Sequence, residues 1–214
     1  MSDDTPPERV PIPFGIVPER PDFDRYLEDT IVIDWQTPAV FEKAKSLCEG
    51  RENAESAARA LFAFVRDEID HSIDVETETV TCNASQVLEE GTGLCYAKSH
   101  LLVALLRARG LPAGFCYQRL RDAASPGRYA LHGFIAVYLF AHARWVLLDA
   151  RGDNDEVRTE FSIDPPSLAY TPDPEQGEEM IPVLLARPAK RVVDLLDHAE
   201  SLGRIRNHLP DSVY

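Results

Sequence analysis

Cys95 is the residue of this chain whose type and position best suit nucleophilic chemistry. It follows Gly91-Thr92-Gly93-Leu94 and opens the most strongly helical stretch, residues 95–109. A thiol at a helix N-terminus meets unpaired backbone N–H groups and the positive end of the helix dipole, and both favour the thiolate. The glycines allow a close backbone approach, so the same N–H groups could bind a developing oxyanion. The alternative is that Cys95 is a small packing residue at a helix start.

The register of a predicted hairpin strengthens the nucleophilic interpretation. Strands are predicted over residues 131–139 and 144–150, with the turn between them. A loop of two or four residues sets His132 opposite Arg151 and diagonal to Asp149, on one face of the sheet. Diagonal partners lie ~7–8 Å apart at Cα, within reach of an imidazole and a carboxylate, whereas an odd loop would put them on opposite faces. A thiol, a histidine and an aspartate so placed fit the pattern of nucleophile, base and orienting carboxylate.

The elements that must position these residues follow from hydrophobic periodicity and from caps and breakers. Helices are predicted over residues 38–49, 54–69, 84–90, 95–109 and 189–203, and strands over residues 30–34, 113–120, 131–139 and 144–150. The last two strands carry apolar residues on both faces, which predicts that other layers cover both sides of the sheet. We therefore predict an α+β fold in which the central Cys95 helix packs on an antiparallel sheet.

A single domain over residues 1–214 is predicted from the length of the chain and its 44% hydrophobic content. Six prolines in residues 1–30 favour an extended arm. Residues 151–214 form a loop-rich extension with a closing helix. The part at 151–182 is rich in proline and acidic residues and long for a loop, which predicts a lid or wall beside the active site.

Two stretches of the sequence resemble a known family. They are GTGLCYAKSHLLVALLRARGLPAG and LHGFIAVYLFAHARWVLLDA, and they are similar to the core of the bacterial transglutaminase-like superfamily. The resemblance implies a papain-like fold with a Cys–His–Asp triad, in which Cys95 is the nucleophile, His132 the base and Asp149 the orienting carboxylate. Gly114 and Ala150 depart from the family pattern without touching the triad.

Other residues near the nucleophile are candidates for the pocket and the oxyanion site. Tyr96 is expected to shape the pocket, and the backbone N–H groups near Leu94 and Cys95 to bind the oxyanion. Gln86 resembles the oxyanion glutamine of papain-like proteases, although its spacing of nine residues to Cys95 differs from theirs. His71 is interpreted as a solvated histidine at a helix end, and not as a ligand.

The remaining cysteines are predicted to be free thiols with packing roles. Cys48 and Cys116 fall in apolar patterns, and Cys82 precedes a short helix, where partial burial is expected. Four cysteines without a CxxC motif or a closely spaced Cys/His set argue against a structural zinc site, and we expect neither a metal nor a cofactor.

The acidic balance of the chain excludes classes of partner. Asp and Glu total 36 against 22 Lys and Arg, a net charge of −14, which repels nucleic acid and anionic membranes. No apolar run approaches a membrane span, and the N-terminus lacks the pattern of a secretory signal, so a cytoplasmic protein is expected. Residues 95–150 are nevertheless basic, with a net charge of +5 that we attribute to pairing with the acidic 151–182 segment.

The sequence therefore predicts a cysteine hydrolase, a peptidase or amidase, that acts on a peptide or amide through a Cys95 thioester. If an amine replaced water as the acceptor, the protein would be a transglutaminase or another amine acyltransferase. Acyl transfer from a thioester carrier, and a non-catalytic peptide-binding module of the same fold, are the other hypotheses. The oligomeric state is left open.

Overall fold

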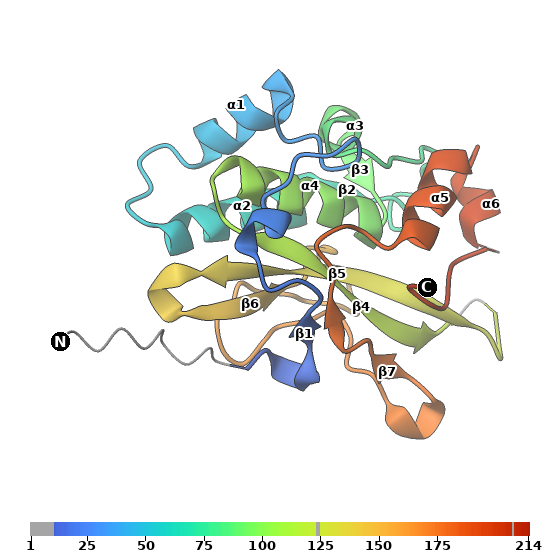
Figure 1. Cartoon of the computed structure of the whole chain (residues 1–214). Coiled ribbons are helices and arrows are strands. Elements are labelled where there is room, and N and C mark those ends of the chain that lie inside the picture. The colour runs from blue at the N-terminus through green and yellow to red at the C-terminus, as the bar shows by residue number, and fades with distance from the viewer. Residues whose placement is uncertain (1–10, 123–124, 207) are drawn as a thin grey trace.

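A four-stranded antiparallel sheet with the strand order β6-β5-β4-β7 is the centre of the computed structural model, which describes residues 11–122, 125–206 and 208–214 (Figure 1). Its strands are β4 (Ala113–Arg121), β5 (Tyr129–Leu139), β6 (Arg144–Leu148) and β7 (Glu179–Met180). The β5–β6 register pairs Ile135 with Leu148 and Leu139 with Arg144. This is the predicted even-loop register, and it confirms the predicted hairpin.

Helices cover one face of this sheet (Figure 1). They are α1 (Pro38–Leu47), α2 (Ala54–Glu68), α3 (Ala84–Glu90) and α4 (Cys95–Ala108). Almost every side chain of α4 is buried, because this helix lies between the sheet and the other three helices. Its start at Cys95 agrees with the predicted boundary, so the fold is the predicted one: the helix that carries Cys95 packs on an antiparallel sheet.

The opposite face of the sheet carries a second apolar cluster, as the strand pattern predicted. Trp145 of the hairpin packs there against Tyr138 and Tyr26, with ring centroids 5.4 Å and 4.9 Å apart, respectively. The segment that supplies Tyr26 is fixed by β1 (Val17–Pro18), which pairs in parallel with β8 (Val183–Leu184). The described part of the predicted N-terminal arm is therefore packed on the sheet.

Short elements complete the described chain. They are the parallel pair β2 (Asp70–His71) and β3 (Thr92–Gly93), the single-turn 3₁₀ helices η1 (Pro13–Gly15), η2 (Phe23–Tyr26), η3 (Phe140–His142) and η4 (Pro174–Gln176), and the helices α5 (Lys190–His198) and α6 (Leu202–Arg206). One closing helix was predicted where the structure has α5 and α6, because the chain turns to extended backbone at Ala199.

The strand predicted over residues 30–34 is wrong. The chain bends there, and the Thr30 amide donates to the Ile33 carbonyl 3.2 Å away. Ile33 is fully buried while Ile31 is 86% exposed, so the β-branched run anchors a turn by a single side chain. No neighbouring strand of the described chain pairs with it.

Candidate active site

Cys95 is the first residue of α4 and is half-buried at its N-terminus. Gly93 allows the backbone before Cys95 to pass close to α4 and Thr81. A Cβ atom at Gly93 would lie 2.9 Å from Cβ of Ala97 and 3.0 Å from Thr81 Oγ1. The first intrahelical bond runs from the Lys98 amide to the Leu94 carbonyl. The amides ahead of it in the first turn are the donors that a helix N-terminus leaves without an intrahelical acceptor.

His132 and Asp149 meet at the end of the hairpin. His132 lies on β5 and Asp149 directly follows β6, and Nε2 of the imidazole is 2.8 Å from Oδ2 of the carboxylate. Both residues are buried, and Asp149 is completely inaccessible. The contact is the one that the even-loop register predicted.

Asp149 is held as a carboxylate by three donors. Besides His132, the amide of Arg151 donates to Oδ1 and the amide of Ala169 donates to Oδ2, over 3.1 Å and 2.9 Å. Burial alone would raise the pKa of Asp149, but the charge of His132 and these hydrogen bonds hold it below its ordinary value. The carboxylate is therefore a fixed negative charge beside the imidazole.

His132 connects this carboxylate to the thiol. Burial by itself would lower its pKa, yet the charges of Asp149 and Cys95 and its hydrogen bonds with both hold the pKa well above the ordinary value for histidine. Because Nε2 is occupied by Asp149, Nδ1 is the nitrogen left for Cys95. Tyr170 packs edge-on against the imidazole, with ring centroids 4.9 Å apart, and shields it from one side.

The ring of Tyr96 docks the start of α4 on β5. Its hydroxyl donates to the carbonyl of Leu131, and its Cδ1 lies 2.9 Å from where a Cβ atom of Gly133 would be. A side chain at Gly133 would thus separate the helix from the strand at the point where Cys95 meets His132. Tyr96 is buried and is one of the residues that line the cavity described next.

A cavity of about 590 Å³, called here the Cys95 cavity, opens over the thiol and the imidazole. Its lining residues are His71, Ile73, Leu94, Cys95, Tyr96, Leu120, Arg121, Asp122, Ala130, Leu131, His132, Arg151, Ala169, Tyr170, Thr171, Glu178 and Leu209. Four of these come from the 151–182 segment beyond Arg151, which confirms the predicted wall. The expected charge pairing with this segment is seen between Arg144 and Asp164, which lie 3.4 Å apart. The guanidinium of Arg119 donates instead to the backbone carbonyl of Gly177, and the backbone amide of Arg121 donates to the carboxylate of Glu178.

Gln86 is outside this set. Its side-chain oxygen accepts a hydrogen bond of 2.9 Å from the amide of Cys82, at the start of α3. Gln86 is exposed on α3 and is not among the residues that line the Cys95 cavity. Leu94 does line the Cys95 cavity, directly before the nucleophile.

The interpretation of His71 as a solvated histidine is wrong. His71 is 8% exposed, it lines the Cys95 cavity, and it pairs with Gly93 in the parallel β2–β3 bridge. Its Nδ1 lies 3.8 Å from Oδ1 of Asp74, and Arg151 holds both oxygens of that carboxylate at 2.7 Å and 2.9 Å. Only the long-range β2–β3 pairing brings His71 here, and no local periodicity in the sequence signals it.

Lys98 is a second residue whose place the sequence did not indicate. One turn after Cys95, its side chain is fully buried, and Nζ donates to the carbonyl of Ile69 at the end of α2. Burial lowers the pKa of Lys98 to about 8. Lys98 therefore ties the segment that carries His71 to the helix that carries Cys95.

The other thiols of the chain differ from Cys95 in their surroundings. Cys48, Cys82 and Cys116 are buried, and burial raises the pKa of each, to about 11 for Cys82. Cys82 was predicted to be only partly buried. No group of three or more His, Cys, Asp or Glu side chains in the described ranges is arranged to hold a metal ion.

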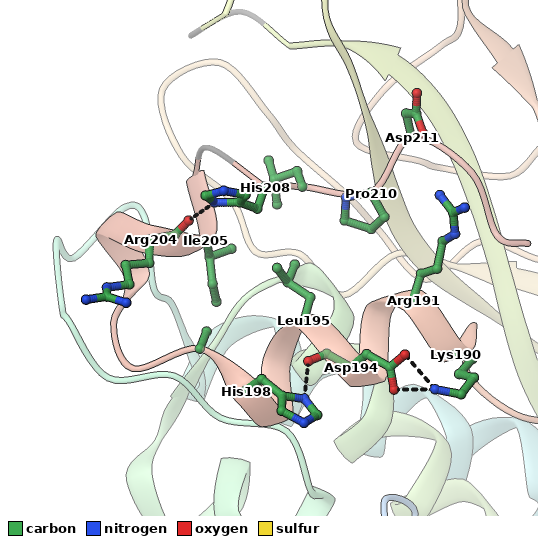
Figure 2. Close-up of a pocket in the computed structure, with 12 residues that line it drawn as sticks. Lys190, Arg191, Asp194, Leu195, His198, Arg204, Ile205, His208, Pro210 and Asp211 are labelled. Atoms are coloured by element: carbon green, nitrogen blue, oxygen red, sulfur yellow. Dashed lines mark hydrogen bonds and ion pairs between the residues drawn. The ribbon is translucent and has the colours of Figure 1, made fainter.

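A second and larger cavity, of about 860 Å³, lies between α5, α6 and the segment at 208–211 (Figure 2). Its charged and imidazole groups bond mostly along their own helices: Lys190 to the carboxylate of Asp194, His198 to the backbone of Asp194, and His208 to the backbone of Arg204. Its lining residues in the described chain include no cysteine, so the nucleophilic chemistry belongs to the smaller cavity.

Comparison with known families gives a match to this region. The profile of the transglutaminase-like superfamily matches residues 42–150, about half of the chain. The chain belongs to the transglutaminase-like superfamily. The matched region contains Cys95, His132 and Asp149, so the geometry described above lies within the part of the molecule that defines membership.

Two solved structures are similar to this chain, and the first shows the same fold. A protein from Cytophaga hutchinsonii, provisionally named a cysteine protease, is 20% identical with a TM-score of 0.50, over 64% of this chain and 46% of that chain. The periplasmic domain of TgpA from Pseudomonas aeruginosa is 17% identical with a TM-score of 0.45, over 60% of this chain and 46% of that domain. The matched region spans less than half the length of either protein.

One further comparison and a property of the helices complete this description. Curated protein sequences contain no significant relative of this chain. None of the helices in the described part of the chain combines the length and the apolar character that crossing a bilayer requires.

Proposed function

We propose that this protein is a cysteine hydrolase, a peptidase or amidase, that transfers the acyl group of a peptide or amide to water through a thioester on Cys95. The observation that carries the proposal is the buried contact of 2.8 Å between His132 and Asp149, beside a thiol at a helix N-terminus. Membership in the superfamily, whose enzymes are generally cysteine-dependent, supports it. A peptide-binding module would not need this arrangement of nucleophile, base and carboxylate.

In the acylation half-reaction, the sulfur of Cys95 attacks the carbonyl carbon of the amide. The charge that develops on the carbonyl oxygen falls near the first amides of α4, which act as an oxyanion site. The C–N bond then breaks as the imidazolium of His132 gives its proton to the leaving amine. The carboxylate of Asp149 fixes the imidazole tautomer and stabilises the imidazolium.

In the deacylation half-reaction, His132 is neutral and accepts a proton from the attacking water. The C–S bond breaks, the acid product leaves, and the thiolate and the imidazolium form again. The apolar wall of the Cys95 cavity, with Leu94, Leu120 and Leu131, favours an acyl group with an apolar side chain. Water suffices as acceptor, so we favour hydrolysis over amine transfer.

The experiment that tests the function traps the thioester. The full chain is mixed with p-nitrophenyl acetate, and the release of nitrophenol is followed together with mass mapping of the modified residue. We expect a burst equal to the amount of protein and an acetyl group on Cys95. Cys95→Ser should lose the burst, while Cys116→Ser, which alters a buried thiol on the other face of the sheet, should keep it. A parent protein without a burst, or acetylation elsewhere, would refute the function.

A further inference from the structure

His71 presents a second imidazole to the Cys95 cavity. It comes from β2, and not from the hairpin that carries His132. The parallel bridge between β2 and β3 pairs His71 with Gly93, two residues before Cys95. The amide of Ser72 donates to the Gly93 carbonyl over 3.2 Å, which fixes the backbone next to the imidazole. His71 and His132 are both lining residues of the cavity that holds the thiol.

The imidazole of His71 is buried with an unused hydrogen-bonding atom. Its Nδ1 is inaccessible and has no hydrogen-bond partner among the described residues; Oδ1 of Asp74 is 3.8 Å away, beyond hydrogen-bonding range. Buried polar atoms without a partner are uncommon in folded proteins, and such an atom calls for an explanation. No described residue forms a hydrogen bond with either nitrogen of His71, so the other nitrogen, Nε2, is also free for a bound molecule.

The charges around His71 keep its ring neutral. Burial is the main cause that lowers its pKa, and the cations Arg151, Lys98 and His132 lower it further. Asp74 acts in the opposite direction, but Arg151 binds both oxygens of that carboxylate. A neutral imidazole has one N–H donor and one acceptor nitrogen.

The position of Asp74 decides which nitrogen is the acceptor. A proton on Nδ1 faces a carboxylate oxygen, whereas a lone pair there would be repelled by it, so the proton belongs on Nδ1. Since Nδ1 is inaccessible, Nε2 is the nitrogen that can meet the cavity. His71 therefore offers the cavity a hydrogen-bond acceptor, in contrast to the oxyanion site, which offers donors.

We propose that His71 binds the acyl acceptor, by accepting a hydrogen bond from the nucleophile that attacks the Cys95 thioester. The inference rests on the proposed function. One hydrogen of the nucleophile leaves as a proton to His132 while its N or O forms the new bond to the carbonyl carbon; the C–S bond breaks and Cys95 departs as thiolate. A second hydrogen of the nucleophile stays on it and is held by His71.

This division of labour sets the chemical class of the acceptor. A nucleophile with two hydrogens on the attacking atom, such as water or a primary amine, serves both histidines. An alcohol or a secondary amine has only one, so it leaves His71 without a donor. Discrimination between these two classes is therefore a property of His71.

The test compares two acceptors that have no O–H group, methoxyamine with two N–H hydrogens and N,O-dimethylhydroxylamine with one. Acetyl-Cys95 is formed with p-nitrophenyl acetate, and its rate of decay is measured with each acceptor. The parent protein should prefer methoxyamine, and His71→Leu should reduce the ratio of the two rates roughly tenfold through the lost hydrogen bond. Taking the ratio cancels the intrinsic difference between the reagents, and the nitrophenol burst should persist in the variant.

Two further variants make the result specific. His71→Gln keeps a side-chain acceptor and should recover part of the ratio, and it also serves if the leucine variant does not fold. His100→Leu removes a buried histidine that bonds the Cys82 carbonyl outside the cavity, and should leave the ratio unchanged. An equal ratio in the parent, His71→Leu and His71→Gln would overturn the role of His71 while leaving the function intact. A parent without a burst would instead overturn the function itself.

Discussion

Two histidines of the Cys95 cavity each lie beside a carboxylate, and their pKa values are shifted in opposite directions from the ordinary value. Besides His132, the donors to Asp149 are uncharged backbone N–H groups. The negative charge of Asp149 therefore acts on the imidazole of His132 and raises the pKa of His132. Burial and the nearby Arg151 cation lower the pKa of His71, and Arg151 also binds both oxygens of the neighbouring Asp74 carboxylate. A carboxylate near a histidine thus predicts its protonation only when the other partners of that carboxylate are known.

The largest expected effect comes from removing the charge on the His132 side. Asp149→Asn should lower the rate of Cys95 acylation and turnover by roughly 100- to 10,000-fold, because the amide cannot stabilise the imidazolium. Far-ultraviolet circular dichroism should change little, since an amide fits the same space. Asp164→Asn, which alters an exposed partner of Arg144, is the matched control. Turnover by Asp149→Asn within a few-fold of the parent would exclude Asp149 as the orienting carboxylate.

The second-largest effect is expected in alkylation of the Cys95 thiol, which distinguishes the role of His132 from that of His71. Iodoacetamide should modify Cys95 before the three buried cysteines, at a rate that changes little between about pH 6 and pH 8, because the raised pKa of His132 preserves its imidazolium. His132→Ala should slow the reaction roughly tenfold or more at about pH 6. His71→Leu should not, since a neutral imidazole gives no charge to the thiolate. Mass-mapped alkylation measures all three, and equal slowing by both variants would contradict the comparison.

The role of Arg151 can be measured on His71 directly. Arg151→Met removes a cation and frees the Asp74 carboxylate, so the pKa of His71 should rise by about 1–3 pH units. The histidine carbon resonances in a nuclear magnetic resonance titration report it. Asp74→Asn in the same experiment should leave His71 neutral, and a His71 titration unaffected by Arg151→Met would contradict the explanation.

The smallest effect is on stability against acid. The pKa of His71 and of His100, the latter about 4, lies below that of the unfolded chain, so unfolding takes up protons below about pH 6.5. Their stability contribution is complete above that pH and falls as the pH is lowered, by roughly 2.7 kcal/mol per pH unit at most for two groups. His132, with a raised pKa, contributes in full below pH 6.5 and adds no slope there.

Urea unfolding between pH 5 and pH 6.5 measures this slope, in a range above most carboxylate titrations. His100→Leu should reduce the slope by roughly half, to about 1.4 kcal/mol per pH unit at most. A slope near zero in the parent would mean that these two histidines are not held neutral in the folded protein.

The parts of the fold that local rules govern were predictable. The start of α4 at Cys95 follows from a glycine-rich turn before an apolar helix, and the contact of His132 with Asp149 follows from the even length of the hairpin loop. The Asn53 cap of α2 is present as a capping box with Ser56. In each case the determining residues are close in sequence.

The parts that failed depend on distant partners. His71 begins an acidic stretch of the sequence, and its place in the cavity depends on its pairing with the distant Gly93. Its neighbour Asp74 is bound by Arg151, a residue 77 positions further along the chain. The run from Thr30 to Ile33 has the composition of a strand but no partner strand in the described chain. Gln86, whose side chain has the chemistry of an oxyanion donor, lies in the first turn of α3, where its oxygen accepts from the Cys82 amide.

The amide of Ala169 has a consequence for how the site responds to its substrate. Ala169 belongs to the wall of the Cys95 cavity, and its N–H is also one of the three donors to Asp149. A bulky substrate that displaced this stretch would withdraw that donor and make the carboxylate a stronger partner for the His132 proton. The fit of the substrate in the cavity and the pKa of His132 beside Asp149 are therefore coupled through a single backbone amide, without any movement of the triad side chains.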